Sequence, residues 1–209
     1  DEVGATGWGL SHAADVATRH RGLALEGARM VIQGFGAVGQ HTARFLCQKG
    51  ARLIAASDTM GAVHNPAGLD AAQLIELKTA GKSVRDHHAG EKLDRDAVID
   101  IECDIWIPAA RPDVVREDNV GRLKTKLVLQ GANIPFSPGA EQALHERGVL
   151  VVPDFIANAG GVICAAMEYR GATEAQAFQA IEERIRANVK AVLGDAAAAR
   201  VPPRRAGRR

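Results

Sequence analysis

The sequence predicts an α/β protein with a Rossmann-like, doubly wound, mostly parallel sheet and helices on both faces. Short apolar runs alternate with segments of helical periodicity along most of the 209 residues, as in successive β–α–β units. A glycine-rich motif of the form G-x-G-x-x-G, over 34–39, directly follows the first run and opens a helical segment. Later runs break at Ser-Asp, proline or glycine, where a strand would leave the sheet. We expect one such domain over 1–199.

The first half of the chain predicts an initial helix and then two strand–helix pairs. Apolar residues recur at helical spacing after Thr6, whose hydroxyl can cap the helix that they form. The run over 29–32 is short, apolar and followed at once by Gly34, which indicates a buried parallel strand. In order, the predicted elements are a helix from Thr6 to near Gly22, a strand over 29–32, a helix over 38–49, a strand over 53–56 and a helix over 69–79. The segment from there to 100 has only weak patterning and predicts no element.

The second half continues the alternation with three more strands. Each is a short apolar run that stops at Pro108, Gly131 or Pro153. Ser137 followed by proline is typical of a helix start, and Gly148 is typical of a helix end. In order, the predicted elements are strands over 104–107 and 127–129, a helix from Ser137 through 145, a strand over 149–152, and helices over 156–169 and from 173 to about 193.

Composition excludes several classes of protein. The chain is 46% hydrophobic and 24% charged, which argues against wholesale disorder, and no run approaches 18 uninterrupted apolar residues, so no membrane partner is expected. Aromatic residues make up only 4%, too few for a base-stacking platform. The cysteines, Cys47, Cys103 and Cys164, form no C-x-x-C pair or Cys/His cluster, which favours a reducing cytoplasm and no metal site. The chain starts without methionine, and we expect it to be a segment of a longer protein.

The last ten residues, 200–209, differ from the rest of the chain. They hold five arginines and no acid, while the rest carries 21 basic and 25 acidic residues. Pro202, Pro203 and Gly207 interrupt any regular pattern there. We therefore expect an Arg-rich disordered tail. The mildly acidic body argues against a nucleic-acid partner.

The glycine motif predicts dinucleotide binding because each of its parts has a role. Gly34 allows the tight turn, Gly36 lets a pyrophosphate approach the backbone, and Gly39 permits close packing of helix and strand. The helix that follows offers free N–H groups and partial positive charge to phosphates. Asp58 stands nineteen residues after Gly39, where its carboxylate can accept hydrogen bonds from the adenosine ribose. A purely structural glycine-rich turn is the alternative.

Two further polar groups follow predicted strands, where ligands bind in a doubly wound sheet. Asn133 lies in a Gly-Ala-Asn-Ile-Pro segment after the strand over 127–129. Asn158 lies in an Asn-Ala-Gly-Gly segment after the strand over 149–152. Asparagine in such a setting can be a simple turn former. We favour ligand contact because both strands would lie near the nicotinamide half of a bound dinucleotide.

Taken together, these segments resemble the glutamate/leucine/phenylalanine/valine dehydrogenase family over roughly 5–186, and they follow the habit of its glutamate dehydrogenase branch. The resemblance implies the cofactor-binding domain of an NAD(P)-dependent amino-acid dehydrogenase, which oxidatively deaminates an L-amino acid to a 2-oxo acid and ammonia. NAD is the expected cofactor because Asp58 should repel a 2′-phosphate, with NADP as the alternative. The matching segments are 5–9, 33–39, 57–58, 108–110, 131–133 and 153–162.

The resemblance also implies roles for single residues. Ala37 stands where the family often has asparagine, within the motif that meets the pyrophosphate. Ser57, next to Asp58, is counted among the cofactor-binding residues. The other implied contacts are Phe35 and Val38 with the pyrophosphate, Asp58 at the adenosine ribose, Ala109 and Ala110 along the cofactor, Asn133 at the nicotinamide ribose, Thr6 near the nicotinamide, Asn158 between cofactor and substrate, and Val162 and Ala165 at the substrate.

Two departures from the family qualify these implications. Ala165 stands where glutamate dehydrogenases usually have a serine that holds the substrate's γ-carboxylate, so glutamate itself is in question. The family's catalytic lysine and aspartate lie in an N-terminal domain whose motifs do not occur here. The resemblance therefore implies no catalytic residue in this segment, an amino-acid substrate met through the other domain, and a homo-oligomer at full length. A non-catalytic NAD-binding or sensing module is the alternative.

Overall fold

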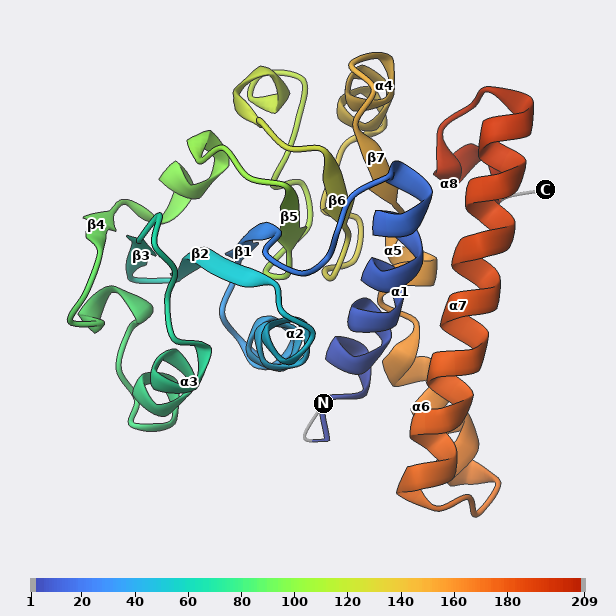
Figure 1. The fold of residues 1–209 in the computed structure, drawn as a ribbon, viewed down its shortest axis with the longest axis horizontal. Helices are drawn as coiled ribbons and strands as arrows, with labels where there is room; N and C mark the ends of the chain where they lie inside the picture. The colour runs from blue at the N-terminus through green and yellow to red at the C-terminus, as the bar shows by residue number, and fades with distance from the viewer. Residues whose placement is uncertain (1–2, 208–209) are drawn as a thin grey trace.

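The computed structural model describes residues 3–207 and shows one twisted sheet flanked by helices (Figure 1). The strands are β1 (Arg29–Gln33), β2 (Arg52–Asp58), β3 (Gly61–His64), β4 (Glu91–Leu93), β5 (Ile105–Pro108), β6 (Leu127–Leu129) and β7 (Leu150–Val152). Within the described residues they form a seven-stranded sheet in the order β4-β3-β2-β1-β5-β6-β7. β2, β1, β5, β6 and β7 run parallel, while β3 and β4 are antiparallel additions at one edge. The predicted fold class is confirmed.

Helices cover both faces of the sheet. The helices are α1 (Ala5–Arg21), α2 (Ala37–Gln48), α3 (Ala71–Thr79), α4 (Pro138–Glu146), α5 (Asp154–Ala157), α6 (Gly160–Tyr169), α7 (Glu174–Ala199) and α8 (Pro203–Ala206), with 3₁₀ turns η1 (Val84–Asp86), η2 (Arg95–Asp100) and η3 (Val120–Arg122). Apolar residues of α1, α2, α3, α6 and α7 form one core with the sheet, and those of η2, η3 and α4 form a second core on the opposite face. Among residues 3–207, no helix is both long and apolar enough to cross a membrane.

The strand order reverses next to β1, which creates the crevice where such sheets bind ligands. β2 lies on one side of β1 and β5 on the other. After β1 the chain crosses to β2, and after β5 it crosses the opposite way to β6. The turn after β1 is the glycine motif, and the segment after β5 begins with Ala109. The topology therefore brings these two segments together.

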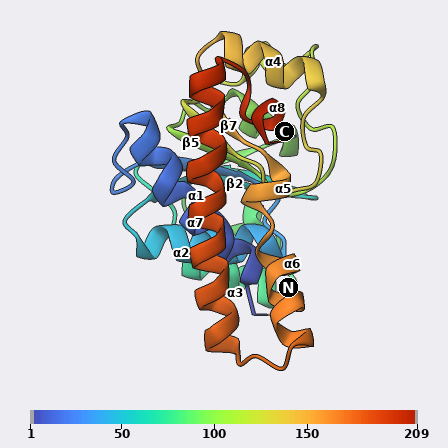
Figure 2. The same cartoon turned by 90° about the vertical axis from the view of Figure 1, so that its right-hand side faces the viewer.

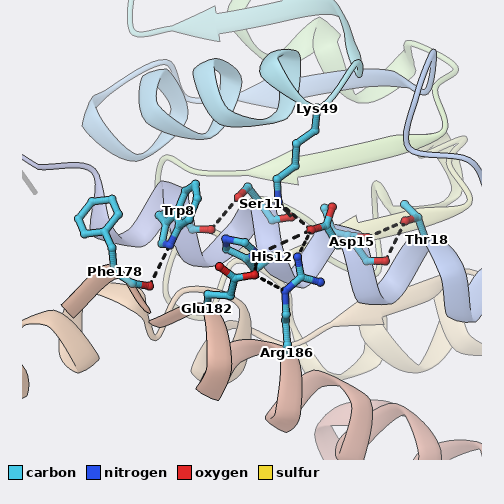
Figure 3. Close-up of polar contacts among 10 residues, drawn as sticks. Trp8, Ser11, His12, Asp15, Thr18, Lys49, Phe178, Glu182 and Arg186 are labelled. Carbon is cyan, nitrogen blue, oxygen red and sulfur yellow. Dashed lines mark hydrogen bonds and ion pairs between the residues drawn. The ribbon is translucent and has the colours of Figure 1, made fainter. Parts of the chain in front are cut away.

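α1 and α7 are joined by a cluster of charged side chains that includes a buried histidine (Figure 3). Asp15 of α1 pairs with Lys49, which follows α2, and with Arg186 of α7. His12 lies between them, with Nδ1 3.7 Å from the Asp15 carboxylate and 3.6 Å from that of Glu182. Neither ring nitrogen has a hydrogen-bond partner among the described residues. Burial, and then the Lys49 charge, lower the pKa of His12 from 6.5 to about 4.

The helix predicted over 156–169 is divided into α5 and α6. The chain leaves helical geometry at Asn158 and resumes it at Gly160. A Cβ at Gly160 would overlap the carbonyl oxygen of Ala5, so α1 passes too close for a larger residue. The packing of the first turn of α1 against this segment therefore requires glycine where α6 begins.

The segment predicted to be a disordered tail is ordered as far as Gly207. α8 packs back against the body of the protein near β7, with Pro203 and Ala206 buried (Figure 2). Arg204 points inward and forms ion pairs with Glu141 and Asp154. The arginine-rich composition suggested solvation, but one of these arginines is the counter-ion of buried acids. Arg208 and Arg209, the rest of the predicted tail, lie outside the described residues.

Candidate functional site

The glycine turn after β1 has the geometry that its spacing predicts. Gly34 has φ +98°, and a Cβ there would lie 2.5 Å from the Cβ of Ala110. A Cβ at Gly39 would overlap the carbonyl oxygen of Gly34, so α2 can approach the turn only with glycine at this position. Gly36 differs because no atom lies within 4 Å of its Cβ position. The turn is thus closed on its protein side and open at Gly36.

The first turn of α2 is an uncapped helix N-terminus. Gly36 is its N-cap residue and makes no side-chain capping hydrogen bond. Ala37 and Val38 are the first two helical residues, so their N–H groups have no partner within the helix. Such groups, together with the partial positive charge of the helix end, favour an anion at the open side of Gly36.

Two hollows meet at this turn. One of about 360 Å³ lies beyond β1 and β2, and the other, of about 520 Å³, lies toward β6 and β7. Both are bordered by Ala109, Ala110 and Arg111, so they are two lobes of one cleft. Of the predicted site residues, Gly34, Phe35, Gly36, Ser57 and Asp58 line the first lobe, Thr6, Val38, Asn133, Asn158 and Val162 line the second, and Ala109 and Ala110 line both.

Three predicted site residues do not line the cleft. Ala37 begins α2, and Gly39 packs against the backbone of Gly34. Ala165 is exposed on α6, three residues after Val162 and on the same helix face. Val162 is itself 75% exposed. Val162 thus borders an open edge of the second lobe, and Ala165 lies next to it on the same helix face, outside the lining.

The Asp58 carboxylate is turned inward, and its side chain is only 6% exposed. Lys78 Nζ and the Val84 amide donate to Oδ2, at 2.8 and 2.9 Å. The Ser83 hydroxyl and the Met60 amide donate to Oδ1, also at 2.8 and 2.9 Å. Burial acts to raise the pKa of Asp58, but these donors outweigh it and the pKa lies below its usual value.

Those four bonds occupy the acceptor capacity of the Asp58 carboxylate. A hydrogen bond from a ribose hydroxyl, which the sequence predicts, would have to displace one of the donors. Sequence reasoning missed Lys78 and Ser83 because they lie twenty or more residues further along the chain, beyond the predicted strand. The sequence feature that could have indicated this partner of Asp58 is Lys78, in the last turn of the helix that follows.

Ser57 borders the first lobe, but its side chain is buried and stabilises the glycine turn. Its hydroxyl accepts from the Gly34 amide at 3.3 Å, and its carbonyl accepts from Phe35 at 2.7 Å. Gln33, which the sequence reasoning also missed, is buried at the edge of the first lobe. Its Oε1 has no hydrogen-bond partner within residues 3–207. A buried oxygen without a partner can accept a hydrogen bond from a ligand bound in the lobe.

Cations gather at the rim of the first lobe. Lys78, Arg95 and Arg111 line it, against the single carboxylate of Asp58. Asp96, nearby, pairs with the guanidinium of Arg95 at 2.8 Å and with that of Arg111 at 3.7 Å. The rim is therefore net positive and suited to an anionic group.

The second lobe is organised by two asparagines. The Asn158 amide donates to the Asn133 side-chain oxygen at 2.8 Å and to the Gly131 carbonyl at 3.3 Å. The Gly131 and Ala132 amides donate to the Pro108 carbonyl, at 2.9 and 2.8 Å, which ties this turn to the end of β5. The structure thus joins the two asparagine segments that the sequence singled out.

Comparisons with known proteins agree on one family. The model of the Glutamate/Leucine/Phenylalanine/Valine dehydrogenase family matches residues 1–207. The chain is 45% identical over 172 residues to an NADP(+)-dependent glutamate dehydrogenase of Pyrobaculum calidifontis, covering 78% of this chain and 40% of that protein. It is 38% identical over 164 residues to an NAD-specific glutamate dehydrogenase of Staphylococcus aureus, covering 78% and 39%.

A solved structure of the same family has a similar fold. A hetero-hexameric glutamate dehydrogenase of Thermus thermophilus, solved with leucine bound, superposes with a TM-score of 0.87 at 27% identity. The superposition covers 97% of this chain and 49% of that one. The chain spans less than half the length of each of these three relatives.

Proposed function

Because the chain belongs to the glutamate/leucine/phenylalanine/valine dehydrogenase family, we propose that it is the cofactor-binding half of an amino-acid dehydrogenase. The whole protein would catalyse the NAD(P)-dependent oxidative deamination of an L-amino acid to a 2-oxo acid and ammonia. The observation that carries this proposal is the cleft of two lobes that meet at an uncapped helix N-terminus. A dinucleotide has the same plan, two nucleoside halves joined by a pyrophosphate.

The residues present fit such a cofactor. The open side of Gly36 and the N–H groups of Ala37 and Val38 would hold the pyrophosphate. The adenosine would lie in the lobe bordered by Asp58, and the nicotinamide riboside in the lobe bordered by Asn133 and Asn158.

When bound, the nicotinamide accepts or supplies the hydride. The chain's own contribution is positional. Asn133 and Asn158 are held by one another and by Gly131, so they can orient polar groups at the second lobe. Val162 and Ala165 present an apolar, open edge where a substrate side chain would lie. We assign the proton transfers to the part of the protein that this chain does not cover, so the chain alone should not turn over amino acids.

For the choice of cofactor, the rim of the first lobe supports the acceptance of NADP as well as NAD. Asp58 was expected to repel a 2′-phosphate, but Lys78 lies 2.8 Å from its carboxylate and offsets the charge. Arg95 and Arg111 add further positive charge. The relatives include both an NADP(+)-dependent and an NAD-specific enzyme.

The whole protein is further proposed to be an oligomer that works in the cytoplasm. The solved relative from Thermus thermophilus is a hexamer. The three cysteines, all of them free, suit a reducing compartment.

Calorimetric titration of the 209-residue chain tests the proposal. NADH and ADP-ribose should both bind at one site per chain, and a panel of L-amino acids with NAD should give no turnover. A chain that is folded by circular dichroism but binds neither ligand would refute dinucleotide binding.

A further inference from the structure

Arg204 of α8 is the cation of a buried polar cluster beside β7. Its Nε donates to Glu141 Oε2 at 2.7 Å. One terminal nitrogen donates to Asp154 Oδ1 and to Gln130 Oε1, both at 2.7 Å. The guanidinium also lies 5.6 Å from the centre of the Phe155 ring. One side chain from the last helix thus ties together the end of β6, α4 and α5.

The two acids of this cluster depend on Arg204 for charge compensation. Glu141 and Asp154 are both buried, and within residues 3–207 neither pairs with another cation. Gln130 bridges them as a neutral amide, donating to Glu141 at 2.6 Å and accepting from the Asp154 backbone amide at 3.0 Å. Without Arg204, the two buried carboxylates would keep only neutral donors, the Gln130 amide for Glu141 and backbone amides for Asp154.

Asp154 connects the Arg204 cluster to the second lobe. Its other oxygen, Oδ2, accepts from the Ile134 amide at 2.6 Å. Ile134 has φ +47°, a left-handed conformation that a β-branched residue adopts only where its surroundings impose it. The residue before it is Asn133, which Asn158 contacts from the end of α5. Asp154 therefore holds the turn that presents Asn133 and begins the helix that presents Asn158.

We propose that Arg204 is a positioning residue for the nicotinamide lobe: it fixes the Asp154 carboxylate, which fixes the strained turn at Ile134 and so the pair Asn133 and Asn158. The proposal rests on the proposed function, because it assumes that a nicotinamide riboside occupies this lobe. The adenosine lobe lies on the far side of the glycine turn and shares no residue with the Arg204 cluster. Loss of Arg204 should therefore weaken one half of the ligand's binding and spare the other.

The test compares NADH with ADP, which lacks the whole nicotinamide riboside, in the 209-residue chain and in Arg204→Met. We expect NADH to bind about tenfold more weakly in the variant and ADP to bind within about twofold of its original affinity. The matched control is Arg205→Met, which removes an exposed arginine from the next position of α8 and should change neither affinity. Equal loss of both ligands, or no loss of NADH, would overturn the proposal.

Hydrogen exchange supplies a second readout that does not depend on ligand. The Ile134 amide should exchange faster in Arg204→Met than in the unsubstituted chain, while amides of β1 should not change. Should Arg204→Met fail to fold, Arg204→Lys decides the matter, since lysine keeps the charge but cannot bridge three partners. It should give an intermediate loss of NADH affinity with faster Ile134 exchange, and unchanged exchange would refute the role. If the unsubstituted chain binds neither ligand, the proposed function fails, and the inference falls with it.

Discussion

Replacing His12 with leucine removes a titratable ring from the space between α1, α2 and α7. In the folded protein this ring faces Asp15 on α1, Lys49 after α2, and Glu182 and Arg186 on α7. Burial and the Lys49 charge lower its pKa from 6.5 to about 4. Between these two values the unfolded chain binds a proton that the folded chain does not. The free energy of unfolding therefore falls as the pH falls from 6.5 to 4.

The size of this loss follows from the difference in pKa. Each unit corresponds to about 1.4 kcal/mol, so a fall from 6.5 to about 4 amounts to about 3 kcal/mol. His12 contributes no pH dependence above that window and none below it. Asp104 titrates separately, because Lys126 and Arg29 outweigh burial and hold its pKa at about 2. Its contribution is lost only as the pH falls below its ordinary value of 3.8.

Urea denaturation at pH 7.5, 6, 5 and 4.5, followed by tryptophan fluorescence, measures the dependence. The unsubstituted chain should lose most of the roughly 3 kcal/mol across this series, and His12→Leu should lose much less. His20→Gln is the matched control, because His20 is exposed on the same helix and should leave the slope unchanged. An identical slope in His12→Leu and the unsubstituted chain would refute the reasoning.

Three further predictions concern the site. Lys78→Met leaves Asp58 without its cation, so NADPH binding should weaken about tenfold relative to NADH binding in fluorescence titrations. Equal weakening of NADPH and NADH would contradict this role of Lys78. Gly36→Ala should leave the melting temperature unchanged, because its Cβ position is open, but weaken NADH at least about tenfold by occupying the place of the pyrophosphate. Unaltered affinity would place the ligand elsewhere. In the whole protein, Ala165→Ser should raise the ratio of kcat/KM for glutamate to that for leucine by about ten- to a hundredfold. An unchanged ratio would mean that another residue binds the γ-carboxylate of glutamate.

The parts of the fold and site that could be predicted from sequence are those fixed by local chemistry. The roles predicted for Gly34, Gly36 and Gly39 follow from backbone geometry alone. The structure shows the tight turn at Gly34 and the close packing at Gly39, and it leaves the Cβ position of Gly36 open. The buried parallel strands were visible because each is an apolar run with a clear stop. β3 and β4 were not, because they are short antiparallel strands, and β4 is a partly exposed edge strand without a continuous apolar run.

The parts that could not be predicted depend on partners distant in sequence. The spacing placed Asp58 at the end of β2, but its orientation is set by Lys78 and Ser83. Arg204 looked like one of several solvated arginines, and only the position of Asp154 in space makes it a buried counter-ion. A buried acid needs a compensating cation, but only the structure shows that Asp154 is buried and that Arg204 faces it.

The packing of α1 against α7 joins the two ends of the described chain and bears on the order of folding. The indole of Trp8 donates to the carbonyl of Phe178, 170 residues away. Pairings of such high sequence separation form late and slow the folding of a domain. During synthesis, the apolar face of α1 would stay uncovered until α6 and α7 have left the ribosome. Trp8 fluorescence should therefore report one of the last events in folding, after the sheet has formed around β1.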